Sequence, residues 1–135
     1  ERIVVMENGL DIGRLGNLAA PVRASATSRR PLRFGFLGSL AWQKGVHVAI
    51  EAFNRIDPAA ATLDIYGSGS AFPEYAADVH AAVRNPSIVI HPPVAHNEIG
   101  AVLRGLDVLI VPSLWYENSP LVIQEAFATR VPVIA

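Results

Sequence analysis

Two glutamates separated by seven residues are the side chains in this sequence with the clearest capacity for ligand chemistry. In the segment LWYENSPLVIQEAFA (residues 114–128), Glu117 precedes an Asn-Ser-Pro turn and Glu125 follows an apolar run. An ionised carboxylate accepts hydrogen bonds through both oxygens, so each side chain suits the paired hydroxyls of a sugar or a ribose. The alternative is that Glu117 lies in solvent and Glu125 lies on an exposed helix face.

A helix is expected to begin between the two glutamates. Ser119 is typical of a helix N-cap, and Pro120 is typical of the first helical position. The apolar Val122 and Phe127 predict that much of this helix is buried. A buried carboxylate needs a compensating contact, so we expect Glu125 to have a specific partner.

Two glycine-containing loops and one helix start add candidates for binding a nucleotide. In GSLAWQKG (residues 38–45), Gly38 admits close backbone approach and Lys44 supplies a cation, which suits a diphosphate. GSG (residues 67–69) offers two glycines, but it lacks the third glycine and the acidic residue of a dinucleotide fingerprint. The free N–H groups of residues 118–121 suit phosphate or sugar oxygens. Either glycine loop could instead be a plain turn, the first with a solvated lysine, and neither matches a Walker A loop.

The elements that position these residues alternate between strand and helix. Short apolar runs predict strands at residues 32–38, 61–69, 87–93, 107–113 and 131–135. Apolar residues at helical spacing predict helices at residues 46–53, 72–83, 99–106 and 120–130. This alternation predicts an α/β fold: a Rossmann-like, doubly wound parallel sheet with helices on both faces. Ligands bind such sheets at the carboxyl edge of the strands, where the loops that carry the candidate residues converge.

Composition narrows the classes of function. The chain has 135 residues, of which 51% are hydrophobic and 17% charged, with a formal net charge of −1 and no cysteine. This balance gives no reason to expect nucleic acid as a partner, and the lack of cysteine excludes disulfides and fits the cytoplasm. The four histidines show no metal-ligand spacing, so we expect no metal site.

Two segments are expected along the chain. Residues 1–31 read as a short strand at residues 3–6 followed by a linker, and residues 32–135 form the α/β unit. The sequence stops in RVPVIA, which is typical of a strand with no turn after it. We therefore expect this chain to be a fragment of a longer protein.

Taken together, the motifs resemble the C-terminal, donor-binding domain of family 4 (group 1) retaining glycosyltransferases, which have the GT-B fold. The resemblance covers residues 32–135 and rests on FGFLGSLAWQKGVHVAIEAF, LDIYGSG and LDVLIVPSLWYENSPLVIQEAFATRVPVIA. These segments carry G-x-L…K-G, Y-G-x-G, D-V-x-x-x-P-S and E-x7-E in order. The opening VVMENGLD resembles the segment that links the two domains of that family. The resemblance implies a unit that is truncated before the family's C-terminal helices and lacks the N-terminal acceptor domain.

The resemblance also implies a role for each candidate residue. Lys44 would bind the donor diphosphate, Glu117 the hydroxyls of the transferred sugar and Glu125 the ribose hydroxyls, with Lys44 and Glu117 as the catalytic pair. The remaining donor-binding positions would be Gly38, Gly67 and Gly69 close to the nucleotide, Pro93 and Val94 facing the base, and the backbone of Asn118, Ser119, Pro120 and Leu121 around sugar and phosphate oxygens. Many family members have an arginine where this chain has Ser39. Ser39 would therefore contribute a hydroxyl contact, or Lys44 would carry more of the neutralising charge.

The function implied by the resemblance is retaining, metal-independent transfer of a sugar from a nucleotide-diphosphate sugar to a glycan, lipid-linked or small-molecule acceptor. No cofactor is implied, because the nucleotide sugar is the substrate. The expected partners are this donor, the N-terminal acceptor domain and, through that absent half, the membrane periphery. The isolated segment is expected to be inactive. A nucleotide-sugar epimerase on the same scaffold and a non-catalytic nucleotide-binding module remain alternatives.

Overall fold

Five parallel strands form the centre of the fold in a computed structural model that describes residues 9–15, 30–117 and 119–135. The strands are β1 (Leu32–Leu37), β2 (Ala61–Tyr66), β3 (Ile88–His91), β4 (Val108–Ile110) and β5 (Val133–Ile134). Their order is β3-β2-β1-β4-β5, and every neighbouring pair runs parallel. The sheet therefore grows outward from β1 in both directions. This is the doubly wound arrangement that the strand–helix alternation predicts.

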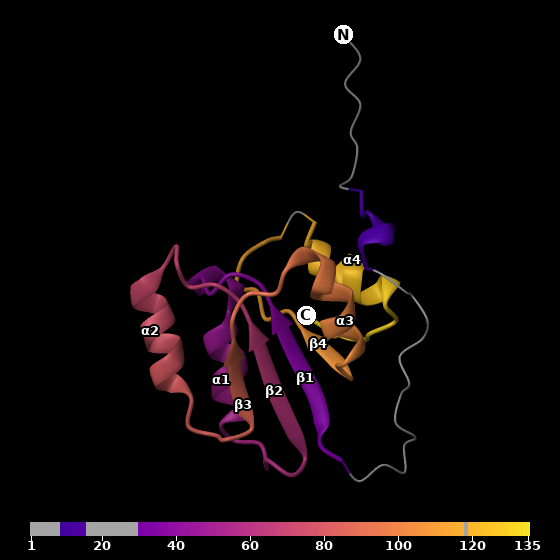
Figure 1. Cartoon of the computed structure of the whole chain (residues 1–135). Helices are drawn as coiled ribbons and strands as arrows, with labels where there is room; N and C mark the ends of the chain where they lie inside the picture. The colour runs from indigo at the N-terminus through magenta and orange to yellow at the C-terminus, as the bar shows by residue number, and fades with distance from the viewer. Residues whose placement is uncertain (1–8, 16–29, 118) are drawn as a thin grey trace.

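Helices cover both faces of this sheet (Figure 1). The helices are α1 (Val46–Phe53), α2 (Pro73–Ala82), α3 (Ile99–Arg104) and α4 (Leu121–Ala128), with the 3-10 helices η1 (Ile12–Leu15), η2 (Trp42–Lys44) and η3 (His96–Glu98). One buried apolar cluster lies between the sheet and α1 and α2, and a second lies between the sheet and α3 and α4. In the described residues, no helix has both the length and the apolar character required to cross a bilayer.

The apolar spacing of α1 explains why that helix packs where it does. Val46, Ala49, Ile50 and Phe53 recur at helical spacing, and all four are buried in the first cluster. Residues at this spacing share one face of a helix, so the helix buries that face and turns its polar residues outward. The beginning of α1 is thereby fixed beside the carboxyl end of β1, where Lys44 lies.

A short segment ahead of the sheet packs onto the second helical layer. Leu15, at the end of η1, is buried, and its carbonyl oxygen accepts a hydrogen bond from Arg104 Nη1 at 3.1 Å. A Cβ at Gly100 of α3 would lie 2.1 Å from the same carbonyl oxygen, so only glycine permits this close approach. The sequence did not predict this contact. The strand expected at residues 3–6 and most of the expected linker lie outside the described residues, so the division at residue 31 remains a prediction.

Several expected boundaries differ from the structure at the carboxyl edge. The strands expected to extend to residues 69, 93 and 113 end at Tyr66, His91 and Ile110, because the Gly- and Pro-containing segments that follow form loops instead. The last helix spans Leu121–Ala128 rather than residues 120–130. Ser119 is not its N-cap: Pro120 occupies that position with extended backbone angles and makes no capping hydrogen bond.

Candidate ligand-binding site

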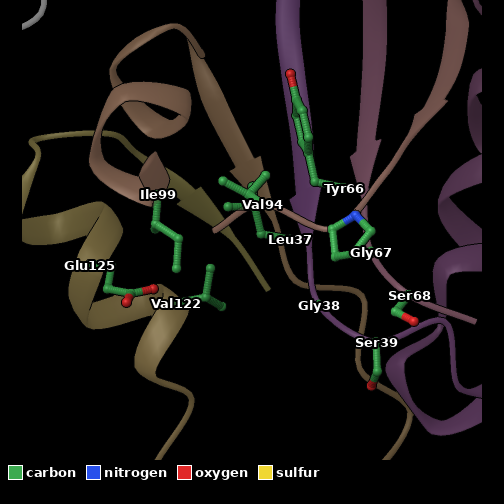
Figure 2. A pocket seen from close by; sticks show the side chains of 11 residues that line it. Leu37, Gly38, Ser39, Tyr66, Gly67, Ser68, Val94, Ile99, Val122 and Glu125 are labelled. Atoms are coloured by element: carbon green, nitrogen blue, oxygen red, sulfur yellow. The ribbon is translucent and has the colours of Figure 1, made fainter. Parts of the chain in front are cut away.

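A cavity of about 320 Å³ opens at the carboxyl edge of the sheet, between the loops that follow the strands and the helices α3 and α4. It is formed at the end of β1 by Leu37, Gly38 and Ser39, at the end of β2 by Tyr66, Gly67 and Ser68, after β3 by Pro93 and Val94, and from α3 and α4 by Ile99, Val122 and Glu125. Its walls are mainly apolar with a few polar groups, and its volume is in the range of small-molecule sites. Figure 2 shows the loops after β1 and β2 on one side of the cavity and α4 on the other.

Close backbone contacts hold the first two loops together. Gly38 N donates to Tyr66 O at 3.1 Å, and Leu40 N donates to Ser68 O at 2.9 Å. A Cβ at Gly67 would lie 2.1 Å from Gly38 O. Gly67 is therefore required for the two loops to meet, in addition to lining the cavity.

Glu125 is a buried acid at the wall of the cavity. The residue is 4% exposed, and Figure 2 shows its carboxylate directed from α4 toward the cavity, beside Val122. Its carboxylate oxygens are not fully buried, because they face the cavity, and no hydrogen bond or ion pair reaches them from the described residues. The specific partner expected from the sequence is therefore not found among those residues. Burial raises the pKa of Glu125, and the electrostatic influence of His96 offsets part of that rise. The wall thus presents an acceptor pair whose hydrogen-bonding capacity the described protein leaves unused.

Lys44 and Glu117 meet in a smaller adjoining cavity of about 40 Å³. Lys44 Nζ donates to Glu117 Oε1 at 2.6 Å, and Ser113 Oγ donates to the same oxygen at 2.9 Å. The hydrogen bond from Lys44 is the main reason that the pKa of Glu117 is lowered, despite partial burial, and Ser113 adds to the effect. The two cavities share Leu37, Gly38 and Val122, so both acids belong to one continuous region.

The backbone around Gly45 brings these charged groups together. Gly45 has a φ of +67°, and a Cβ there would lie 1.8 Å from Pro112 O. Leu114 N donates to Gln43 O at 2.8 Å, which joins the loop after β1 to the loop after β4. Sequence reasoning passed over Gly45 because its role depends on a contact with a segment that lies far away in the chain.

The structure separates the expected site residues into three groups. Gly38, Ser39, Gly67, Pro93, Val94 and Glu125 line the main cavity, whereas Gly38, Lys44, Glu117 and Pro120 line the smaller one. Gly69, Ser119 and Leu121 line neither: Gly69 packs against Ala76, Ser119 Oγ accepts a hydrogen bond from Gln124, and Leu121 is exposed. Asn118 lies outside the described residues. In the part of the chain that is described, no group of three acidic or histidine side chains could hold a metal ion.

Tyr66 was not predicted as a site residue, although the motif Y-G-x-G contains it. Its ring stacks on His91 with centroids 4.5 Å apart, and His91 Nε2 lies 2.7 Å from Asp64 Oδ1. His91 therefore lies behind the cavity wall as a support for Tyr66. Burial is the main cause of the raised pKa of Tyr66.

A family model and a curated relative both match this chain. The family model described as "Glycosyl transferases group 1" matches residues 31–135. Glycogen synthase of Mycobacterium tuberculosis is 32% identical over 137 residues, which cover 98% of this chain but only 31% of that relative. The chain thus spans less than a third of the length of this curated relative.

Solved structures share the fold at lower identity. A C-terminal domain of a glycosyl transferase group 1 family protein from Francisella tularensis superposes with a TM-score of 0.63 at 24% identity, over 94% of this chain and 70% of that one. The Anabaena protein HepE, solved in complex with UDP and glucose, superposes with a TM-score of 0.69 at 20% identity, over 77% of this chain and 29% of that one. At these identities the likeness supports the fold.

Proposed function

This chain belongs to the group 1 glycosyl transferases, and from that membership we propose that it forms the donor-binding half of a retaining sugar transferase. The donor is a nucleotide-diphosphate sugar, and the acceptor is a glycan, a lipid-linked group or a small molecule. The N-terminal acceptor domain of the same protein completes the enzyme, so this segment alone does not transfer sugar. The proposed location is the cytoplasm, with any membrane contact made at the periphery through the acceptor half.

The buried carboxylate of Glu125 is the observation that carries this proposal. Ionising an acid that is 4% exposed and accepts no hydrogen bond from the described residues costs free energy. Two adjacent hydroxyls, such as those of a ribose, supply the donors that both oxygens accept. The surrounding apolar walls and the nearby Gly38 and Gly67 leave room for a nucleoside, with the base beside Pro93 and Val94.

The paired charges of Lys44 and Glu117 fit the other end of such a donor. The diphosphate binds Lys44, and the transferred sugar places its hydroxyls on Glu117 beside it. When the bond between sugar and diphosphate breaks, negative charge grows on the departing phosphate, and the Lys44 ammonium offsets that charge without a metal ion. Ser39 lines the main cavity and adds a hydroxyl donor near the same phosphate.

Titration of the full-length protein with UDP-, GDP- and ADP-sugars tests the proposal. One of these donors is expected to bind, and Glu125→Ala and Lys44→Ala each weaken that binding about ten- to a hundredfold, the cost of about 1.5–3 kcal/mol for a hydrogen bond to a charged group. Glu74→Gln on the exposed surface of α2 is the control and leaves affinity unchanged. Unchanged binding in both site variants refutes this site.

Product analysis separates the alternative functions. A transferase moves the sugar to an acceptor, whereas an epimerase returns a donor with inverted sugar stereochemistry and no acceptor product. A non-catalytic module binds the donor and leaves it intact. Only the first result supports the proposed function.

A further inference from the structure

The hydroxyl of Ser113 lies within the charged cluster but has no role in the function proposed above. Ser113 Oγ and Lys44 Nζ both donate to Oε1 of Glu117, at 2.9 Å and 2.6 Å. The second oxygen, Oε2, accepts no hydrogen bond from the described residues. The Glu117 carboxylate is therefore fixed at one oxygen and open at the other.

We propose that Ser113 is a positioning residue, which keeps Glu117 directed at the transferred sugar when Lys44 turns to the donor diphosphate. This inference rests on the proposed function, because it requires that Lys44 and Glu117 both touch the donor. It assigns different roles to the two donors that bind Oε1. The Lys44 ammonium moves when the donor binds, and the Ser113 hydroxyl stays in place.

The mobility of Lys44 follows from its chemistry and exposure. Its side chain is 33% exposed, and its ammonium carries three donors on a flexible four-carbon stem. A diphosphate brings more negative charge than one carboxylate, so it draws the ammonium toward itself. The hydrogen bond from Lys44 to Glu117 then weakens or breaks as the donor binds.

The fixed position of Ser113 follows from the backbone around it. A single torsion angle, χ1, places the Oγ of serine. The next residue, Leu114, donates its N–H to Gln43 O at 2.8 Å. The loop is also held where Gly45 approaches Pro112 O, at a separation that leaves no room for a Cβ. The serine hydroxyl therefore remains in place after the ammonium moves, and Oε2 remains free for a sugar hydroxyl.

A purely structural serine would behave differently from a positioning one. If Ser113 only stabilised the loop after β4, its loss would disturb the whole site and weaken every ligand equally. If it positions Glu117, its loss affects only ligands that carry the sugar. The comparison between a nucleoside diphosphate and its sugar conjugate therefore separates the two roles.

Calorimetric titration of the full-length protein with UDP and UDP-glucose, or with the ADP or GDP pair if the wild type prefers it, makes this comparison. Ser113→Ala is expected to leave affinity for the nucleoside diphosphate unchanged and to weaken the nucleotide sugar about tenfold, as loss of one hydrogen bond to a charged group predicts. Ser113→Thr retains the hydroxyl and restores the affinity. Ser87→Ala, which removes another half-buried serine hydroxyl at the opposite end of the sheet, changes neither ligand.

A double-mutant cycle ties the effect to Glu117. In a Glu117→Ala background, Ser113→Ala is expected to cause no further loss of nucleotide-sugar affinity, because the group it positions is gone. Equal weakening of both ligands by Ser113→Ala, no weakening of either, additive losses in the cycle, or failure of Ser113→Thr to restore affinity each overturns the inference. A wild-type protein that binds none of the nucleotide sugars refutes the proposed function itself, which is a distinct result.

Discussion

Glu125→Gln is expected to raise the stability of the protein measured without ligand and to lower its affinity for the nucleotide-sugar donor. The substitution keeps the shape of the side chain and removes the charge of a residue that is 4% exposed and whose desolvation disfavours the charged form. At neutral pH we expect the free energy of unfolding to rise by about 1 kcal/mol, toward the lower end of the cost of an uncompensated buried polar group. In a thermal scan of the full-length protein this corresponds to an increase in Tm of roughly 2–4 °C, the range for domains of more than about 150 residues.

The pH dependence of this gain has a definite sign. Burial raises the pKa of Glu125 above its ordinary value of 4.5, so the folded protein binds this proton more tightly than the unfolded chain. The resulting stabilisation is fully present below pH 4.5 and is lost as the pH rises through the raised pKa. The difference in Tm between Glu125→Gln and the wild type should therefore be present at pH 7 and disappear near pH 4.

Donor affinity should move in the opposite direction. An amide has one acceptor oxygen where the carboxylate has two, and its NH₂ group faces a ligand hydroxyl that needs an acceptor. Affinity for the nucleotide sugar should fall about ten- to a hundredfold, the cost of about 1.5–3 kcal/mol for a hydrogen bond to a charged group. The exposed Glu74→Gln carries the same charge change and should leave affinity unchanged, and because Glu74 lies in the first turn of α2, loss of its charge should not raise Tm. A lower Tm for Glu125→Gln at pH 7, or unchanged donor affinity, would refute this account of Glu125.

Two further predictions concern the framework of the fold. Gly45→Ala forces a positive φ on alanine and directs its Cβ into Pro112 O, so chemical denaturation should show a loss of about 3 kcal/mol or more. Gly35→Ala directs its Cβ at the side chain of the buried Leu106 rather than at backbone and requires no positive φ, so it should cost less, about 1–3 kcal/mol; equal losses would contradict this contrast. Asp107→Asn should lower Tm at neutral pH, because the hydrogen bond from Arg30 is the main cause of the lowered pKa of Asp107. A lowered pKa gives stability that is present above the ordinary value of 3.8 and lost as pH falls, so a Tm difference that persists well below pH 3.8 would contradict it.

The fold could be predicted from the sequence because its elements are encoded locally. The stripe of Val46, Ala49, Ile50 and Phe53 defines a helix and its buried face from eight consecutive residues. The approach of Leu15 to Gly100 could not be predicted in this way. It joins residues far apart in the chain, and the segment around Leu15 shows no apolar period that would indicate burial.

The prediction that the helix around Glu125 is buried rested on Val122 and Phe127, and Phe127 lies on a different side of the helix from Glu125. Phe127 is 64% exposed and lies on the outer side of α4. Val122, Glu125, Ala126 and Thr129 recur at helical spacing, and the last three are buried. The phase of the helix was therefore readable from the sequence, once Val122 rather than Phe127 was taken to mark the inner face.

The contact between Lys44 and Glu117 could not be predicted from the sequence. Because of it, the two acids of the site differ in their hydrogen-bond partners and in the direction of their pKa shifts. Glu117 has partners in the empty protein that hold its pKa down, whereas burial without such partners raises the pKa of Glu125. A group that the protein already neutralises must exchange a partner to bind a ligand, so much of its binding energy is spent on that exchange. Glu125 accepts no hydrogen bond from the described residues, so a ligand need not displace a protein donor from it. On the proposed function, nucleoside affinity therefore depends chiefly on Glu125, Lys44 adds affinity for the diphosphate, and Glu117 distinguishes the donor that carries a sugar.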